Sequence, residues 1–197
     1  MDTIEALSQA FALKDERRTG WQLRGIADPE SVAGHTWGVA LLCLQFGAEA
    51  GIDTDRALRM AIVHDVAEAK TGDVATRVSD ADQRVPSDVK HREERNAMNS
   101  LAEPLVPDVR NLWEEYEARE TPESTFVKDM DLVDMCLQAL VYEREGRYDG
   151  ESEHFKEYED LDEFFATAEP RLRTTVGNRL FEEIKMRYET VRDAKHG

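Results

Sequence analysis

The sequence predicts an all-α fold, a single helical bundle of about seven to nine helices. Apolar residues recur at helical spacing along nearly the whole chain, and no stretch of any length shows the alternation typical of a strand. Residues that start and end helices punctuate this pattern. The 197 residues contain no internal repeat and no linker long enough to separate domains, so we expect one domain spanning 1–197.

Three helices are expected in the N-terminal part of the chain. Apolar residues that share one face predict a first helix over about 2–14. A loop over 15–30 follows, with an unusual concentration of arginines for so acidic a protein. Ser31 is placed to cap a second helix, which Gly51 ends. Asp53 or Thr54 caps the third helix, which continues from an apolar run through His64 and Asp65.

The rest of the chain follows the same plan. A polar loop is expected over 72–85, and Pro86 suits the first turn of a helix that reaches about residue 102. Another helix carries Trp113 and Tyr116, and Thr121-Pro122 opens a long one that Gly146 ends. Two last helices over about 151–195, the second beginning near Pro170, are expected to pack on a motif-bearing core of about 10–145.

Composition excludes several classes of partner. The chain has 42 acidic against 25 basic residues, a formal net charge of −17, so nucleic acids and anionic membrane surfaces are disfavoured. No apolar run reaches the roughly 20 residues of a membrane span, and the N-terminus lacks the features of a signal peptide. Cys43 and Cys136 lie inside apolar patterns and are expected to be buried free thiols. We therefore expect a cytoplasmic protein.

The chemistry is expected where the third helix ends. There an apolar run is followed by a cluster of His64, Asp65, Glu68 and Asp73. Such groups next to a core are costly unless they are paired, hydrogen-bonded or bound to a metal. His64 and Asp65 can converge on one ion, and Glu68, four residues after His64, could act on water bound to it. Taken alone, a His-Asp pair is far more often a capped helix end with a solvated carboxylate than a metal site.

Two further residues on other helices complete a possible ligand set. His35 lies on the apolar face of its helix, where a single histidine is more often a hydrogen-bonded core residue. Asp131 flanks the apolar face of the long helix, a position where an aspartate is usually solvated. Together with His64 and Asp65, they would offer two imidazoles and two carboxylates, enough to hold one divalent metal.

The order of these residues and their surroundings resemble a known family. The chain is similar to the HD superfamily of metal-dependent phosphohydrolases, and most of all to its 5'-deoxynucleotidase group. The likeness covers about 10–145 and rests on the segments Arg18-Thr19-Gly20-Trp21, Pro29-Glu30-Ser31-Val32-Ala33-Gly34-His35-Thr36, His64-Asp65-Val66-Ala67-Glu68, Thr71-Gly72-Asp73, Leu112-Trp113-Glu114-Glu115-Tyr116-Glu117 and Phe126-Val127-Lys128 with Asp131.

The resemblance implies a role for each site residue. The metal ligands would be His35, His64, Asp65 and Asp131, with Asp129 as the rival for the last place. Glu68 would be the catalytic carboxylate, and Asp73 a second acid that faces substrate and water. Arg18, with Arg17 as its neighbour and rival, would grip the phosphate, and Trp21 would lie near the sugar. The cofactor would be one divalent ion: Mn, Co, Zn, Ni, Fe or Mg.

The implied reaction removes the 5'-phosphate from (deoxy)nucleoside monophosphates by attack of a metal-activated water. The resemblance also implies a small-molecule nucleotide as partner and a homodimer. Two alternatives stay open from the sequence. The same site could act on another phosphoester, such as a nucleoside triphosphate, an alarmone or a cyclic nucleotide, or the chain could be a metal-binding module without catalysis.

Overall fold

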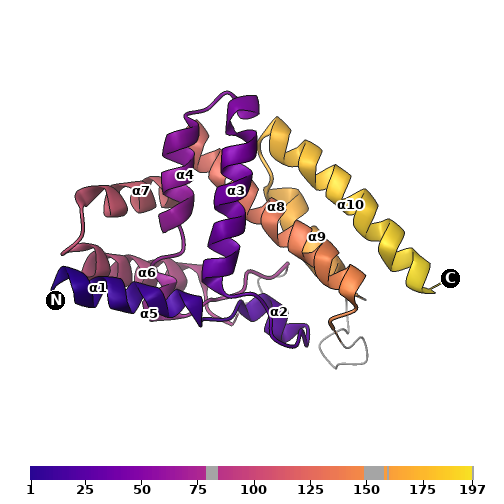
Figure 1. The fold of residues 1–197 in the computed structure, drawn as a ribbon, viewed down its shortest axis with the longest axis horizontal. Coiled ribbons are helices and arrows are strands. Elements are labelled where there is room, and N and C mark those ends of the chain that lie inside the picture. The colour runs from indigo at the N-terminus through magenta and orange to yellow at the C-terminus, as the bar shows by residue number, and fades with distance from the viewer. Residues whose placement is uncertain (79–83, 149–157, 159, 197) are drawn as a thin grey trace.

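A computed structural model describes residues 1–78, 84–148, 158 and 160–196 of the protein (Figure 1). Within these residues the regular structure is helical, and the only extended pairing is an isolated bridge between Arg17 and Ser31. The all-α prediction is confirmed. Part of the segment in which the last two helices were expected, 151–157 and 159, lies outside the described residues.

The α-helices lie close to the predicted positions. Their bounds are α1 Thr3–Ala10, α2 Thr19–Leu23, α3 Val32–Ala50, α4 Thr54–Val63, α5 Glu68–Thr71, α6 Ser87–Ala102, α7 Pro107–Ala118, α8 Pro122–Glu145, α9 Asp162–Ala168 and α10 Thr175–His196. The side chains of Ser31 and Asp53 cap α3 and α4, and Thr121 caps α8 with Ser124 in a reciprocal capping box. Gly51 and Gly146 end α3 and α8 in the left-handed conformation.

The long helix α8 lies at the centre of the molecule. It packs against α3, α4 and α7 on one side and against α9 and α10 on the other (Figure 1). Its buried residues include Phe126, Met130 and Leu140, which belong to one core that runs through the described residues. Burial of that apolar surface stabilises the bundle, at about 25 cal/mol per Å² removed from water. The core thereby fixes α3, α4 and α8, the three helices that carry or directly precede the predicted metal ligands.

Three local predictions were wrong. A short helix, α2, forms within the segment expected to be a loop. The helix expected to continue through His64 ends at Val63, and a turn over 64–67 precedes α5, so Glu68 starts a new helix. Pro170 begins no long helix, because it lies in the 3-10 helix Glu169–Arg171 and Leu172 is extended. No helix in the described parts of the chain is both long and apolar enough to cross a membrane.

Candidate metal centre and substrate pocket

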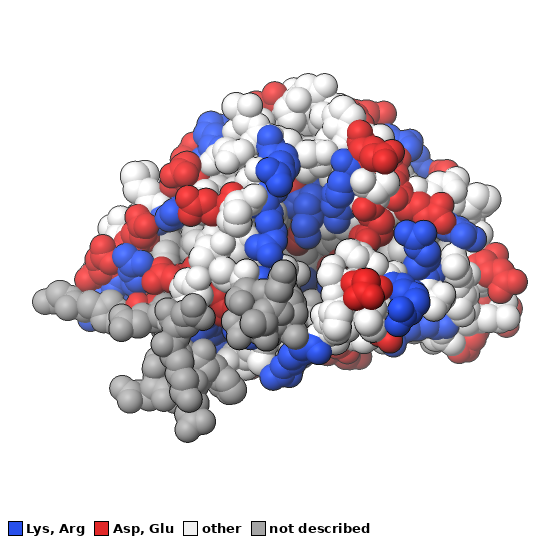
Figure 2. All heavy atoms as spheres, turned by 180° about the vertical axis from the view of Figure 1, so that it is seen from behind, with Lys and Arg blue, Asp and Glu red and all other residues white. Residues whose placement is uncertain are grey.

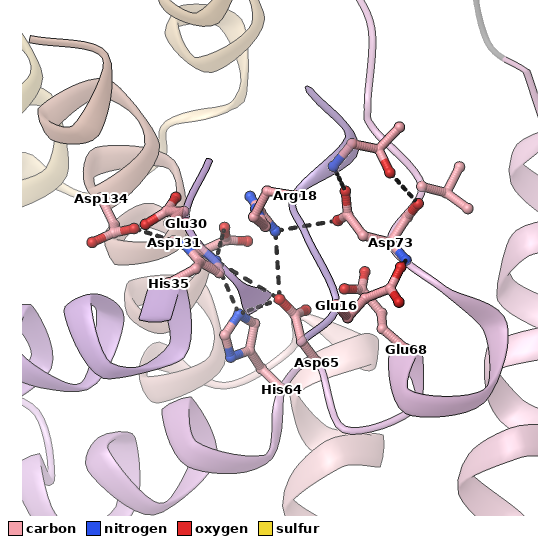
Figure 3. Close-up of polar contacts among 12 residues, drawn as sticks. Glu16, Arg18, Glu30, His35, His64, Asp65, Glu68, Asp73, Asp131 and Asp134 are labelled. Atoms are coloured by element: carbon pink, nitrogen blue, oxygen red, sulfur yellow. Dashed lines mark hydrogen bonds and ion pairs between the residues drawn. The ribbon is translucent and has the colours of Figure 1, made fainter. Parts of the chain in front are cut away.

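The four predicted ligands lie together (Figure 3). His35 comes from α3, His64 from the C-terminal end of α4, Asp65 from the turn after it, and Asp131 from α8. The Nε2 atoms of the two histidines are 3.4 Å apart. Oδ2 of Asp65 lies 3.1 Å from Nε2 of His64, and Oδ1 of Asp131 lies 3.2 Å from Nε2 of His35. Four potential ligand atoms thus converge from three helices and a turn.

The outer nitrogens of both rings are held by the protein. Nδ1 of His64 lies 2.7 Å from the carbonyl oxygen of Ala61, which can only accept, so this nitrogen carries the hydrogen. Nδ1 of His35 lies 2.7 Å from Oδ2 of Asp134. This arrangement turns both Nε2 atoms toward the same space, as the outer partners of metal-bound histidines do. The sequence reading gave Asp134 no such role.

The donor set fits a metal ion. The Oδ2 atom of Asp65 is buried and has no hydrogen-bond partner, although it lies 3.7 Å from Nε2 of His35. A buried carboxylate oxygen without a partner is costly. Ligand atoms of His35, His64 and Asp131 all lie within 4.8 Å of one another. A divalent cation with mixed nitrogen and oxygen ligands would satisfy these atoms together.

Two donors occupy the far oxygen of Asp131. Its Oδ2 accepts hydrogen bonds from the Tyr116 hydroxyl at 2.9 Å and from Nζ of Lys128 at 2.7 Å, which leaves Oδ1 toward His35. Burial raises the pKa of Asp131, but the charge of Lys128 and the contact with His35 outweigh it and hold this pKa well below its usual range. The carboxylate is therefore ionised and oriented.

Both ring nitrogens of His35 face carboxylates, Nδ1 that of Asp134 and Nε2 that of Asp131. Burial and the charge of Arg18 lower the pKa of His35, but hydrogen bonds with Asp131 and Asp134 outweigh them and raise it to about 10.

Asp129 lies on the opposite side of α8. Its carboxylate accepts from the backbone nitrogen of Thr174 at 2.6 Å, from the Thr174 hydroxyl at 2.6 Å and from the backbone nitrogen of Arg173 at 3.1 Å. These groups precede α10. Asp129 is therefore engaged by the start of α10, and the geometry brings only its rival, Asp131, to the two histidines.

Arg18 stands beside the cluster. Its Nη1 atom lies 3.6 Å from Oδ2 of Asp65 and 3.5 Å from Oδ1 of Asp73. Asp73 also accepts two hydrogen bonds from Thr19: its carboxylate accepts from the backbone N–H, and its carbonyl oxygen accepts from the hydroxyl. These bonds join the segment after α5 to the start of α2. Arg17, the neighbouring candidate, turns to Pro29 and Asp28 instead. Of the two arginines, the one that faces the cluster is Arg18.

The Glu68 carboxylate has one oxygen, Oε2, that is buried without a hydrogen-bond partner. Nζ of Lys90 lies 3.9 Å from the other oxygen, Oε1. Burial and then the charges of Asp65 and Asp73 raise the pKa of Glu68 well above its usual value. Lys90, on α6, is held in turn by Glu94 at 3.5 Å and by the carbonyl oxygen of Val74 at 3.1 Å.

One cavity of about 490 Å³ is lined by Arg18, His64, Asp65, Glu68, Asp73 and Asp131. Trp21 lies in its wall and is almost completely buried. Its indole nitrogen donates to Glu30 at 2.9 Å, and its ring packs on Phe164 of α9 with 3.9 Å between ring centroids. On the face opposite to that of Figure 1, lysines and arginines gather around a hollow in the surface (Figure 2). Sequence reasoning missed Phe164 and Lys90, because no local pattern reports contacts between distant helices.

Comparisons with known proteins show the family to which the chain belongs. A family model described as "HD domain" matches residues 10–173. The protein "5'-deoxynucleotidase HDDC2" of Bos taurus is 40% identical over 144 residues, 71% of this chain and 67% of that protein. The "5'-deoxynucleotidase hdd1" of Schizosaccharomyces pombe is 36% identical over 149 residues, 72% of this chain and 71% of its own.

Solved structures share the fold. The PH0347 protein of Pyrococcus horikoshii aligns over 96% of this chain and 98% of its own, with a TM-score of 0.66 and 30% identity. The HD phosphohydrolase DatZ of cyanophage S-2L, solved with dA and one catalytic Zn²⁺ ion, aligns over 94% of this chain and 96% of its own. Its TM-score is 0.55 and its identity 23%, so this likeness concerns the fold alone.

Proposed function

The chain belongs to the HD-domain family, and we propose that it is a metal-dependent hydrolase that removes the 5'-phosphate from deoxynucleoside monophosphates. The observation that supports this most strongly is the buried, unpartnered Oδ2 of Asp65, which lies 3.1 Å from Nε2 of His64 and 3.6 Å from Nη1 of Arg18. A candidate metal ligand and a candidate phosphate-binding group thus meet at one atom. Relatives named 5'-deoxynucleotidase, at up to 40% identity, support the choice of substrate.

We propose that His35, His64, Asp65 and Asp131 hold one divalent ion: Mn, Co, Zn, Ni, Fe or Mg. When bound, such an ion acts as a Lewis acid that makes water more acidic and draws charge from a phosphoryl oxygen. Asp134, Tyr116 and the carbonyl oxygen of Ala61 hold the ligands in position from outside.

The other residues of the cavity handle the phosphate and the proton. The Arg18 guanidinium, oriented by Asp65 and Asp73, would donate to the equatorial phosphate oxygens and stabilise their charge during in-line attack. Glu68 would accept the proton of the attacking water, because its Oε2 has no other partner and its raised pKa makes it a stronger base. Asp73 would keep Arg18 and the start of α2 in place. Trp21, backed by Phe164, would form the wall beside the sugar.

The test is phosphate release from a panel of deoxy- and ribonucleoside 5'-monophosphates, with metal-stripped protein and each metal added separately. We expect metal-dependent release that is faster with deoxynucleotides. Release from nucleoside triphosphates or cyclic nucleotides alone would contradict the choice of monophosphates. Glu68→Ala is expected to keep its metal and lose turnover by about 10²- to 10⁴-fold, whereas loss of metal from this variant would make Glu68 a ligand.

We also propose that the protein works as a homodimer in the cytoplasm. Trp37, Leu41 and Leu44 form an apolar stripe on α3 that is 69%, 49% and 57% exposed, and exposed apolar patches often mark contact surfaces. Both cysteines are buried free thiols, as suits a reducing compartment. Light scattering on the full chain is expected to give twice the mass of one chain. For Trp37→Glu, the same measurement is expected to give the mass of a single chain.

A further inference from the structure

Arg119 occupies an unusual backbone position at the edge of the cavity. It follows the last residue of α7, where its φ of 55° lies in the left-handed region. That position usually falls to glycine, because a side chain there costs on the order of 1 kcal/mol. Arginine at this place needs a compensating contact or a use.

The compensating contact is a stack on Tyr116. The Arg119 Cζ atom lies 3.3 Å from the centroid of the Tyr116 ring, and such cation–π contacts are favourable. The Tyr116 hydroxyl in turn donates to Asp131 at 2.9 Å. Arg119 thus reaches the candidate metal ligand through the tyrosine, one side chain further out than Arg18 or Lys128.

The hydrogen-bonding capacity of the Arg119 guanidinium is largely unused. Its Nη1 atom is buried and has no hydrogen-bond partner among the described residues. Its Nη2 atom lies 3.8 Å from Oε1 of Glu117, which is an ion-pair distance and too long for a hydrogen bond. A buried donor without an acceptor costs free energy, and Arg119 lines the cavity that contains the metal cluster. The position suits an acceptor supplied by a ligand.

We propose that Arg119 binds the nucleobase of the substrate. This rests on the proposed function, in which the phosphate lies between the ligand cluster and Arg18. Arg119 lines the same cavity but contacts Asp131 only through Tyr116, so the part of the substrate that it meets is the nucleoside. A planar guanidinium held by an aromatic ring presents N–H donors in a fixed plane, and every nucleobase offers carbonyl or ring-nitrogen acceptors at its edge.

The decisive experiment compares substrates with and without a base. For Arg119→Ala, we expect kcat/KM for deoxynucleoside 5'-monophosphates to fall roughly 10- to 100-fold, while kcat/KM for 2-deoxyribose 5-phosphate stays unchanged. Equal losses on both substrates, or no loss on either, would overturn the proposal, because a structural role or a phosphate contact does not depend on the base. Arg119→Lys should restore little, since it keeps the charge but loses the planar donors.

A matched control lies on α7, the helix that Arg119 follows. Arg110 is solvent-exposed, pairs with Glu114 and does not line the cavity, so Arg110→Ala is expected to leave both substrates unaffected. Calorimetric binding of deoxynucleosides to the metal-loaded protein provides a readout without turnover. If wild-type protein hydrolyses no monophosphate, the proposed reaction fails, yet weaker deoxynucleoside binding by Arg119→Ala would still support base recognition. Equal binding by the two proteins would contradict it.

Discussion

Asp129 and Asp131 lie two residues apart on α8, and the structure uses them in opposite ways. The Asp129 carboxylate is filled by donors from Arg173 and Thr174 at the start of α10. Asp131 points one oxygen at Nε2 of His35, 3.2 Å away, in a cluster where Oδ2 of Asp65 is buried without a hydrogen-bond partner. A carboxylate whose hydrogen bonds are complete stabilises the fold, whereas converging oxygens and nitrogens that leave one buried oxygen without a partner are suited to a bound ion.

Asp131→Ala is expected to give the largest effect. It removes one ligand and leaves Tyr116 and Lys128 without their acceptor. Second-layer residues alone change metal affinity by about 10- to 100-fold, so we expect a loss of at least about 100-fold here, with turnover lost as well. Metal content after dialysis and phosphate release measure it. Wild-type metal content in this variant would remove Asp131 from the ligand set.

Gly38→Ala tests the cluster indirectly, through the residue that orients His35. A Cβ at Gly38, on α3, would overlap the Asp134 carboxylate, which holds Nδ1 of His35. The carboxylate must move, so we expect metal affinity to fall by about 10- to 100-fold while the fold survives. A titration with a chelating indicator measures the affinity. An unchanged affinity would show that Asp134 does not orient His35 for a metal.

Asp129→Ala should damage the fold and spare the metal. Arg173 and Thr174 lose their shared acceptor, and we expect about 1–2 kcal/mol of lost stability in denaturant unfolding. Gly177→Ala is its partner test, because a Cβ there would overlap Asp129. Metal content in both variants should equal that of the wild type. A loss of metal at wild-type stability would reverse the roles of the two aspartates.

The cysteines offer the mildest test of the same contrast. Burial raises the pKa of Cys43 to about 12 and that of Cys136 higher still. Both thiols should therefore resist a thiol reagent near neutral pH in the native protein and in Asp131→Ala. Labelling should become faster in Asp129→Ala, since Cys136 lies on the helix that loses its contact. Equal labelling of all three proteins would indicate that Asp129 contributes little to stability.

The sequence predicted best what local chemistry controls. The bounds of α3 and α8 could be predicted because residue type alone indicates a cap: a hydroxyl side chain at the start, in Ser31 and Thr121, and a glycine at the end, in Gly51 and Gly146. The turn after Val63 was missed because a continuous apolar run gives no signal of a break. The helix α2 was missed because it is a single turn that contains a glycine.

The site divides in a similar way. His35, His64, Asp65 and Asp131 were predicted together through the family resemblance, and the structure brings them into contact. By helical position alone, Asp131 could not be told from Asp129, since the difference lies in what packs against each side of α8. The partners that orient the ligands escaped prediction because each reaches its ligand from another helix or another turn, as Tyr116, Lys128 and Asp134 do.

The central claim is that this cluster holds one ion on which hydrolysis depends. The most direct test titrates a divalent metal into stripped protein while phosphate release from deoxyadenosine 5'-monophosphate is followed. We predict that activity rises from the background and reaches a plateau at one ion per chain, and that Asp131→Ala shows no such rise. Full activity in the stripped protein, or a normal plateau in Asp131→Ala, would contradict the account.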